Sequence, residues 1–281
     1  MVTHDVRGVP VPALLYGTAW KEDQTEALTT AALNAGFTGI DTANQRKHYH
    51  EAGVGRAVIA WTQAGGKPPF LQTKFTYRRG QDDRLPYDPS APVDEQVRQS
   101  FASSLAHLGV PTIHSYVLHG PELDRGWSPT DQLVWRTMES LHDAGLVRLL
   151  GVSNVRLDQL RALIDTARIL PAFVQNRCYA STGFDREIRA VCAGFGPENR
   201  MIYQGFSLLT ANRELWGNRA LHPIARRIGG TPAQVLLRYA MHLGMIPLTG
   251  TTDPTHMRAD LACAILELSD EEQATIARLA V

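Results

Sequence analysis

The strongest constraint on the fold of this chain is a repeated alternation between short apolar segments and longer segments of helical period. A run of four to six mainly apolar residues, often preceded by Gly or Pro, is typical of a buried strand. Such runs occur at residues 12–17, 37–40, 69–74, 113–118, 147–152, 172–176, 201–206 and 244–248. Strands that alternate with helices form parallel sheets, so the pattern predicts an α/β protein.

Several helices are marked by their end residues as well as by their apolar period. The segment before Gly36 has helical spacing and stops at that glycine, and Thr130 is a candidate cap for a helix that ends at Gly145. Thr231 begins a capping box with proline at the first helical position, and Ser269 begins a second box before the last helix. Further helices are predicted over residues 51–63, 97–108 and 184–193.

Eight strand-helix units within 281 residues, without a break in composition, favour a (β/α)8 TIM barrel that forms a single domain over residues 1–281. A doubly wound sheet is the competing α/β architecture. No G-x-G-x-x-G follows any of the predicted strands, so the dinucleotide-binding version of that fold is disfavoured.

Charge and composition exclude several functional classes. The 28 basic and 28 acidic residues give a net charge of 28 − 28 = 0, and no basic stripe indicates a nucleic-acid partner. The three cysteines have no C-x-x-C spacing, which is typical of reduced thiols. No signal peptide and no long apolar run is present. We therefore expect a cytoplasmic protein without a membrane or nucleic-acid partner, either a monomer or a weak homo-oligomer.

Polar side chains stand at or just after the carboxyl ends of most predicted strands. In a barrel these ends open on one face, so their residues converge on a common site. Singly, each has an ordinary structural interpretation: Asp41 as a cap or ion-pair partner, Lys74 as a solvated lysine, His119 as a structural histidine. Their joint position on three successive strands favours a functional centre. The full set is Asp41, Lys74, His119, Ser153, Asn154, Gln175, Phe206 and Ser207.

These stretches resemble the aldo-keto reductase family over nearly the whole chain, from Val11 to about Leu279. The matching segments are GT at residue 17, GFTGIDTA at 36, EAGVG at 51, LQTK at 71, VLHGP at 117, GLVRLLGVSN at 145 and PAFVQN at 171. Some are weak alone, but their order and spacing are specific. The resemblance implies a barrel that binds a nicotinamide cofactor and reduces an aldehyde or ketone to an alcohol by NAD(P)H-dependent hydride transfer.

The resemblance also implies a catalytic tetrad of Asp, Tyr, Lys and His, in which tyrosine is the general acid. Asp41, Lys74 and His119 match three members. A phenol has an unperturbed pKa of about 10, and we expect the Lys74 ammonium, held by Asp41, to lower it. The loop before Glu51 is two residues longer than the family pattern, so the tyrosine position is shifted. Tyr49 is assigned the acid role, with His48 as the alternative proton donor.

For the cofactor, the resemblance implies NADPH (NADP+), with NADH possible. Ser153, Asn154 and Gln175 match the contacts of the nicotinamide carboxamide, and Phe206 matches the aromatic residue that stacks on its ring. At the adenosine end, the family's lysine, arginine and asparagine are replaced by Gly250, His256 and Asp260, so two cations that favour a 2′-phosphate are lost. The remaining expected cofactor positions are Thr18, Asp41, Ser207, Leu209, Thr251 and Thr252.

The expected substrate is a small-molecule carbonyl compound. Trp20 resembles a wall of the substrate pocket, and His48 lies in the same loop as Tyr49. Gly120 replaces a tryptophan that often follows the histidine, and the chain ends soon after its last helix. A roomy pocket that accepts bulky carbonyl substrates is therefore expected.

Two other functions remain open from the sequence. The displaced tyrosine allows a catalytically silent protein that binds the cofactor without turnover. The second is a metal-dependent barrel hydrolase, in which His48, His50 and His119 would be ligands. That H-x-H pair lies within a loop instead of at a strand end, so no metal site is assigned.

Overall fold

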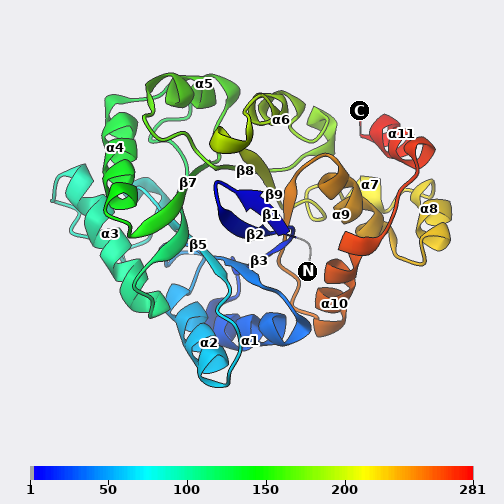
Figure 1. Ribbon diagram of the computed structural model, residues 1–281, viewed down its shortest axis with the longest axis horizontal. Helices are drawn as coiled ribbons and strands as arrows, with labels where there is room; N and C mark the ends of the chain where they lie inside the picture. Colours follow the sequence, from blue (N-terminus) through cyan, green and yellow to red (C-terminus); the bar gives the residue numbers. More distant parts are fainter. Residues whose placement is uncertain (1–2, 281) are drawn as a thin grey trace.

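The computed structural model describes residues 3–280, and its centre is a closed barrel of parallel strands in the order β10-β3-β4-β5-β6-β7-β8-β9 (Figure 1). Because each strand pairs with its neighbours in chain order, successive βα loops emerge side by side at one end. The barrel strands are β3 (Leu15–Gly17), β4 (Gly39–Asp41), β5 (Phe70–Phe75), β6 (Ile113–Leu118), β7 (Val147–Ser153), β8 (Phe173–Arg177), β9 (Ile202–Phe206) and β10 (Ile246–Thr249).

Helices surround the barrel on its outer side (Figure 1). Between residues 3 and 280, none of them is long and apolar enough to cross a membrane. The α-helices are α1 (Thr25–Ala35), α2 (Glu51–Gln63), α3 (Val93–Leu108), α4 (Pro129–Asp143), α5 (Leu157–Thr166), α6 (Arg186–Ala193), α7 (Arg213–Trp216), α8 (Leu221–Arg227), α9 (Pro232–His242), α10 (Pro254–Ala262) and α11 (Asp270–Leu279). Single 3-10 turns are η1 (Glu22–Gln24), η2 (Arg78–Gly80), η3 (Ala180–Thr182), η4 (Pro197–Asn199) and η5 (Cys263–Ile265).

The predicted (β/α)8 fold is confirmed, and each barrel strand overlaps its predicted segment. Gly36 ends α1 with a left-handed φ of 109°, and the capping boxes at Thr231 and Ser269 both form. The prediction that Thr130 caps α4 is wrong. Ser128 is the cap, because its side chain accepts from the Asp131 amide while Asp131 reciprocates, with proline at the first helical position.

A hairpin of β1 (Thr3–Val6) and β2 (Val9–Pro12), absent from the sequence prediction, closes the amino-terminal end of the barrel. Its valines Val6, Val9 and Val11 are buried in one cluster with residues at or near the starts of the barrel strands, such as Phe70 and Phe173. In Figure 1 the hairpin lies across the middle of the barrel. It seals the end opposite the βα loops, so the open face is the one formed by those loops.

Strand β5 shows how alternation places the polar residues inside the barrel. Leu71 and Phe75 belong to the apolar cluster between the sheet and the helices. Phe70, Gln72 and Lys74 lie on the opposite face, where Phe70 packs on the hairpin cluster and the other two contact Asp41. Because side chains alternate along a strand, one apolar and two polar layers follow one another up the barrel axis.

Gly55 faces α3 so closely that a Cβ there would lie 1.8 Å from the His107 carbonyl oxygen. Because backbone cannot yield as a side chain can, we expect Gly55→Ala to lower the free energy of unfolding by about 3 kcal/mol. Chemical denaturation measures this. Gly196→Ala is the matched control, since a Cβ at Gly196 meets nothing within 4 Å; equal stability of the two variants would contradict the packing argument.

Candidate active site

The centre of the loop face is a buried ion pair between strands β4 and β5. Lys74 Nζ lies 2.7 Å from each oxygen of the Asp41 carboxylate and donates a further hydrogen bond of 2.8 Å to the Thr42 carbonyl. The two residues are 0% and 2% exposed. Burial lowers the pKa of Lys74, while the Asp41 charge opposes that shift. The bidentate contact compensates for the desolvation of both charges.

A layer of buried amides holds Asp41 from below. Its Oδ1 accepts hydrogen bonds from Gln72 Nε2 at 2.7 Å and from Gln175 Nε2 at 3.0 Å. Gln204 Oε1 accepts from the Nε2 groups of both glutamines, and Ser115 Oγ donates to Gln72 Oε1. Strand register places Asp41 beside Gln72, Gln72 beside Ser115, and Gln175 beside Gln204. This network, of which the sequence singled out only Gln175, fixes the carboxylate that orients Lys74.

The loop after β4 places Tyr49 beside the ion pair, and it places His48 against Trp20. The Tyr49 ring centroid is 5.4 Å from Lys74 Nζ and 5.8 Å from the His119 ring, which it meets edge-on. The His48 ring instead packs against the Trp20 ring in a tilted arrangement, with centroids 3.8 Å apart, and the His48 carbonyl accepts from the Trp20 amide. The geometry therefore favours Tyr49 over His48 as the group beside Lys74.

The expected lowering of the Tyr49 pKa is contradicted. Burial, and then the negative charge of Asp41, raise the pKa of the Tyr49 phenol. The physical reason is the placement of the lysine: its hydrogen bonds are directed to Asp41 and Thr42, and among the described residues none joins Nζ to the phenol oxygen. Tyr49 consequently keeps its proton at neutral pH.

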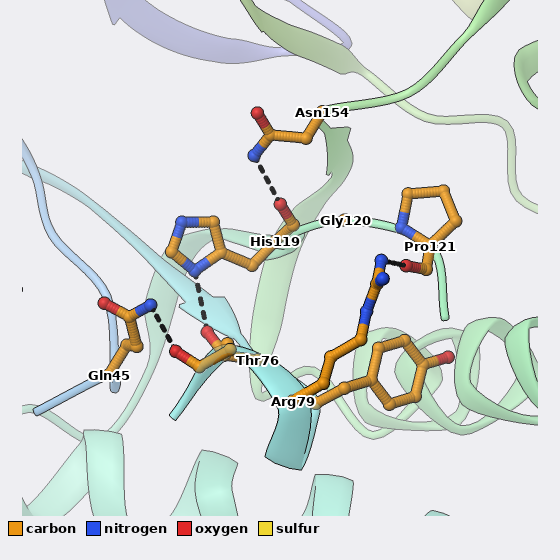
Figure 2. Close-up of a pocket in the computed structure, with 9 residues that line it drawn as sticks. Gln45, Thr76, Arg79, His119, Gly120, Pro121 and Asn154 are labelled. Atoms are coloured by element: carbon orange, nitrogen blue, oxygen red, sulfur yellow. Dashed lines mark hydrogen bonds between the residues drawn. The ribbon is translucent and has the colours of Figure 1, made fainter. Parts of the chain in front are cut away.

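His119 follows β6 and is held from two sides. Its Nδ1 lies 2.7 Å from the Thr76 hydroxyl, and its backbone carbonyl accepts from Asn154 Nδ2 at 2.7 Å (Figure 2). Burial and then the Lys74 charge lower the pKa of His119 from 6.5 to about 3. The imidazole is therefore neutral at physiological pH and meets a ligand through hydrogen bonding rather than charge.

A cavity of about 460 Å³ opens beside His119 (Figure 2). This volume lies within the range of small-molecule sites. Of the residues that the sequence assigned to the substrate pocket, Gly120 contributes to the wall. Trp20, which is 69% exposed, and His48 are not among the lining residues, nor is Tyr49. The lining residues are Gln45, Thr76, Tyr77, Arg79, Gly80, His119, Gly120, Pro121 and Asn154.

The carboxyl ends of β7 and β8 bring three of the predicted cofactor residues together. Ser153 Oγ donates to the Gln175 carbonyl at 2.6 Å and accepts from Asn154 Nδ2 at 3.2 Å. Asn154 has a φ of 51°, which turns its side chain toward the cavity wall. Among residues 3–280, neither Asn154 Oδ1 nor Gln175 Oε1 has a hydrogen-bond partner. Both oxygens can therefore accept from a ligand amide.

Strand β9 ends in Phe206, whose ring is contacted by the guanidinium of Arg177 at 5.5 Å. The following Ser207 has a φ of 55°, and its carbonyl accepts from the Ala211 amide, which begins a turn. Leu209 lies in that turn, where its carbonyl accepts from the Trp216 indole at 3.0 Å. The loop at the predicted pyrophosphate position is thus ordered by its own hydrogen bonds.

Residues 250–260 surround the end of β10 and the start of α10. Thr251 and Thr252 precede Asp253, which caps α10, and His256 is exposed in the first turn. Asp260 is 6% exposed and accepts from the Thr249 hydroxyl, and burial raises its pKa. Its carboxylate therefore has an internal partner. Thr18, also predicted for the cofactor, is fully buried and donates to the Asp41 carbonyl at 3.0 Å.

Lys21 is a residue that the sequence reasoning missed. It is 8% exposed, donates to the Gly250 carbonyl, and forms no ion pair with a carboxylate in the described part of the chain. A Cβ at Gly250 would lie 3.7 Å from Lys21 Nζ. The ammonium thus occupies the space next to the position where the family pattern has its own lysine. The signal available was its position shortly after the GT segment, four residues beyond Gly17.

Metal ligation has no support in the geometry. Within residues 3–280, no group of three or more His, Cys, Asp or Glu side chains could hold a metal ion. The His48 ring packs against Trp20.

Comparison with known proteins identifies the family of this chain. The model of the Aldo/keto reductase family matches residues 14–281, and the chain belongs to that family. An aldo-keto reductase of Mycobacterium sp. (strain MCS) is 29% identical over 97% of this chain and 88% of its own length. The 2,5-diketo-D-gluconic acid reductase B of Corynebacterium sp. is 30% identical over 84% of this chain and 77% of its own length.

Solved structures share the fold. The aldose reductase from Schistosoma japonicum superposes with a TM-score of 0.80 at 24% identity, covering 99% of this chain and 92% of that one. An aldo/keto reductase from Brucella melitensis gives a TM-score of 0.81 at 24% identity, covering 99% of this chain and all of that one. Family membership supports an oxidoreductase.

The folded-state pKa of His119 lies below its unfolded value of 6.5. Its stabilising contribution is therefore complete above the unfolded pKa and is lost as the pH falls below it. From about pH 7 to about pH 5, this one group should remove at most about 2 kcal/mol of stability. Chemical denaturation of the parent and of His119→Asn at both pH values tests this prediction. Between the two pH values, the free energy of unfolding should fall by less in His119→Asn than in the parent. In the exposed control His222→Asn it should fall by as much as in the parent.

Proposed function

We propose that this protein reduces an aldehyde or ketone to an alcohol with a nicotinamide cofactor, and that Tyr49 supplies the proton. The observation that carries the proposal is the arrangement of Tyr49 over the buried Asp41–Lys74 pair, edge-on to His119 at the cavity. Relatives named as a 2,5-diketo-D-gluconic acid reductase and a methylglyoxal reductase support carbonyl reduction as the class of reaction.

The residues of the loop face fit a nicotinamide cofactor. Asn154 Oδ1 and Gln175 Oε1 would accept from its carboxamide, and Phe206 would supply a ring face. Lys21, a buried cation without a carboxylate partner among residues 3–280, would neutralise a phosphate near Gly250. This cation favours NADPH, although the Gly250 and His256 replacements leave NADH possible. When bound, the cofactor supplies the hydride.

The chain's own residues then divide the remaining work. His119, neutral and fixed by Thr76, orients the substrate oxygen through a hydrogen bond. Tyr49, still protonated, donates its proton to that oxygen as negative charge develops there. Lys74 then stabilises the phenolate that Tyr49 becomes, and Asp41 keeps the ammonium charged and positioned.

Removing the phenol oxygen in Tyr49→Phe should lower kcat by about 10² to 10⁴-fold, the usual contribution of a general acid. His48→Ala should lower it by less than about tenfold, because His48 stacks on Trp20 instead of facing Lys74. NADPH oxidation with a panel of aldehydes measures both, and NADPH binding to each variant is measured by fluorescence.

The opposite order of the two variants would assign the proton to His48. A parent that binds NADPH and turns over no carbonyl compound would favour the catalytically silent protein instead.

Lys21→Met keeps a long unbranched side chain and removes the terminal ammonium group with its charge. Loss of a charge-assisted contact to a phosphate should weaken NADPH binding by at least about tenfold. Equilibrium titration of the protein with NADPH measures this, and Lys67→Met, which removes an exposed lysine between α2 and β5, is the charge-matched control. Unchanged NADPH affinity in Lys21→Met would show that Lys21 has no role in cofactor binding.

A further inference from the structure

The cavity beside His119 carries a single formal charge on its wall. Arg79, in the turn η2 after β5, is the one lysine, arginine, aspartate or glutamate among the lining residues. His119 is neutral, and the other lining groups are uncharged amides, hydroxyls and backbone. The lining of the cavity therefore presents one fixed positive charge, that of Arg79.

The Arg79 guanidinium is held in place while most of its donors stay available. Nη2 donates to the Pro121 carbonyl at 2.6 Å, which ties η2 to the loop after β6, as Figure 2 shows. Nη1 lies 3.1 Å from Asp124 Oδ1. A guanidinium has five N–H donors, so these two contacts leave about three for a ligand. In the view of Figure 2, Arg79 and Gln45 lie on opposite sides of His119.

The partner Asp124 does not neutralise this cation for a ligand. Its side chain is 94% exposed and that of Arg79 is 53% exposed. Ion pairs between such exposed groups contribute little, because water screens them and both side chains lose freedom. A carboxylate inside the cavity would be better desolvated than Asp124 and could take the fork-shaped donor set in a bidentate manner.

We propose that the substrate is an anionic carbonyl compound, an aldehyde or ketone acid, whose carboxylate is bound by Arg79 while its carbonyl faces His119 and Tyr49. This inference rests on the proposed function and specifies its substrate class. Arg79 thereby acts as the specificity-determining residue of the cavity. The two ends of the molecule are recognised by different chemistry: a fixed cation at one end, and neutral hydrogen-bond donors at the other.

The test compares acids with their own methyl esters, which have the same skeleton without the charge. Para-carboxybenzaldehyde and succinic semialdehyde, each with its methyl ester, are reduced with NADPH by the parent and by Arg79→Met, Arg79→Lys and the control Arg78→Met. Arg78 is the exposed neighbour and does not line the cavity. We expect the parent to show the higher kcat/KM for at least one acid over its ester.

In Arg79→Met the acid-to-ester ratio of kcat/KM should fall by at least about tenfold, mainly through KM, since a charge-assisted bidentate contact is lost. Arg79→Lys should fall between parent and Arg79→Met, because lysine keeps the charge without the fork. Arg78→Met should keep the parent ratio. An unchanged ratio in Arg79→Met, or an equal loss for acid and ester, would overturn the proposal.

A second readout does not depend on turnover. Para-hydroxymethylbenzoate is the alcohol that forms when the aldehyde group of para-carboxybenzaldehyde is reduced. It is titrated calorimetrically into the parent and into Arg79→Met in the presence of NADP+. Binding that is at least about tenfold weaker in the variant supports the acid site even if no carbonyl compound is reduced. Equal binding overturns it. Absence of turnover with every compound would instead count against the proposed function.

Discussion

The rest of the loop face depends on the buried contact between Asp41 and Lys74. Two opposite charges at 2.7 Å, almost wholly removed from water, are stable there only because additional groups satisfy their remaining hydrogen-bonding capacity. Gln72 and Gln175 supply donors to Asp41, and the Thr42 carbonyl accepts from Lys74. The buried polar side chains inside this barrel thus serve to hydrogen-bond and position one ion pair.

The pair explains the properties of the groups above it. The Asp41 charge contributes to the raised pKa of Tyr49, and the Lys74 charge contributes to the lowered pKa of His119. Tyr49 is therefore a protonated phenol and His119 a neutral imidazole, which suits proton donation by one and carbonyl orientation by the other. Both shifts begin with burial, so the loops that exclude water are as important as the charges.

Much of the fold could be predicted because the alternation of strands and helices is a local pattern. The barrel strands overlap their predicted segments, and glycine or capping residues mark several helix ends. The hairpin of β1 and β2 was missed, since two four-residue strands, the second with two prolines, have little local signal and are stabilised by packing on the barrel. At α4, Ser128 instead of Thr130 is the cap because the reciprocal contact with Asp131 decides between two plausible residues.

The sequence by itself determined which chemical groups stand at the strand ends: the acid at 41, the lysine at 74 and the histidine at 119 follow from strand boundaries and from family resemblance. Tertiary structure decided how they are used. Counting along the loop could not separate Tyr49 from His48, whereas stacking of His48 on Trp20 leaves Tyr49 over Lys74. Nor could spacing place Lys21 at Gly250, or Arg79 in the cavity wall, because those contacts join loops far apart in the chain. Secondary structure depends mainly on neighbouring residues in the chain, whereas a site is formed by tertiary contacts between residues that are far apart in the sequence.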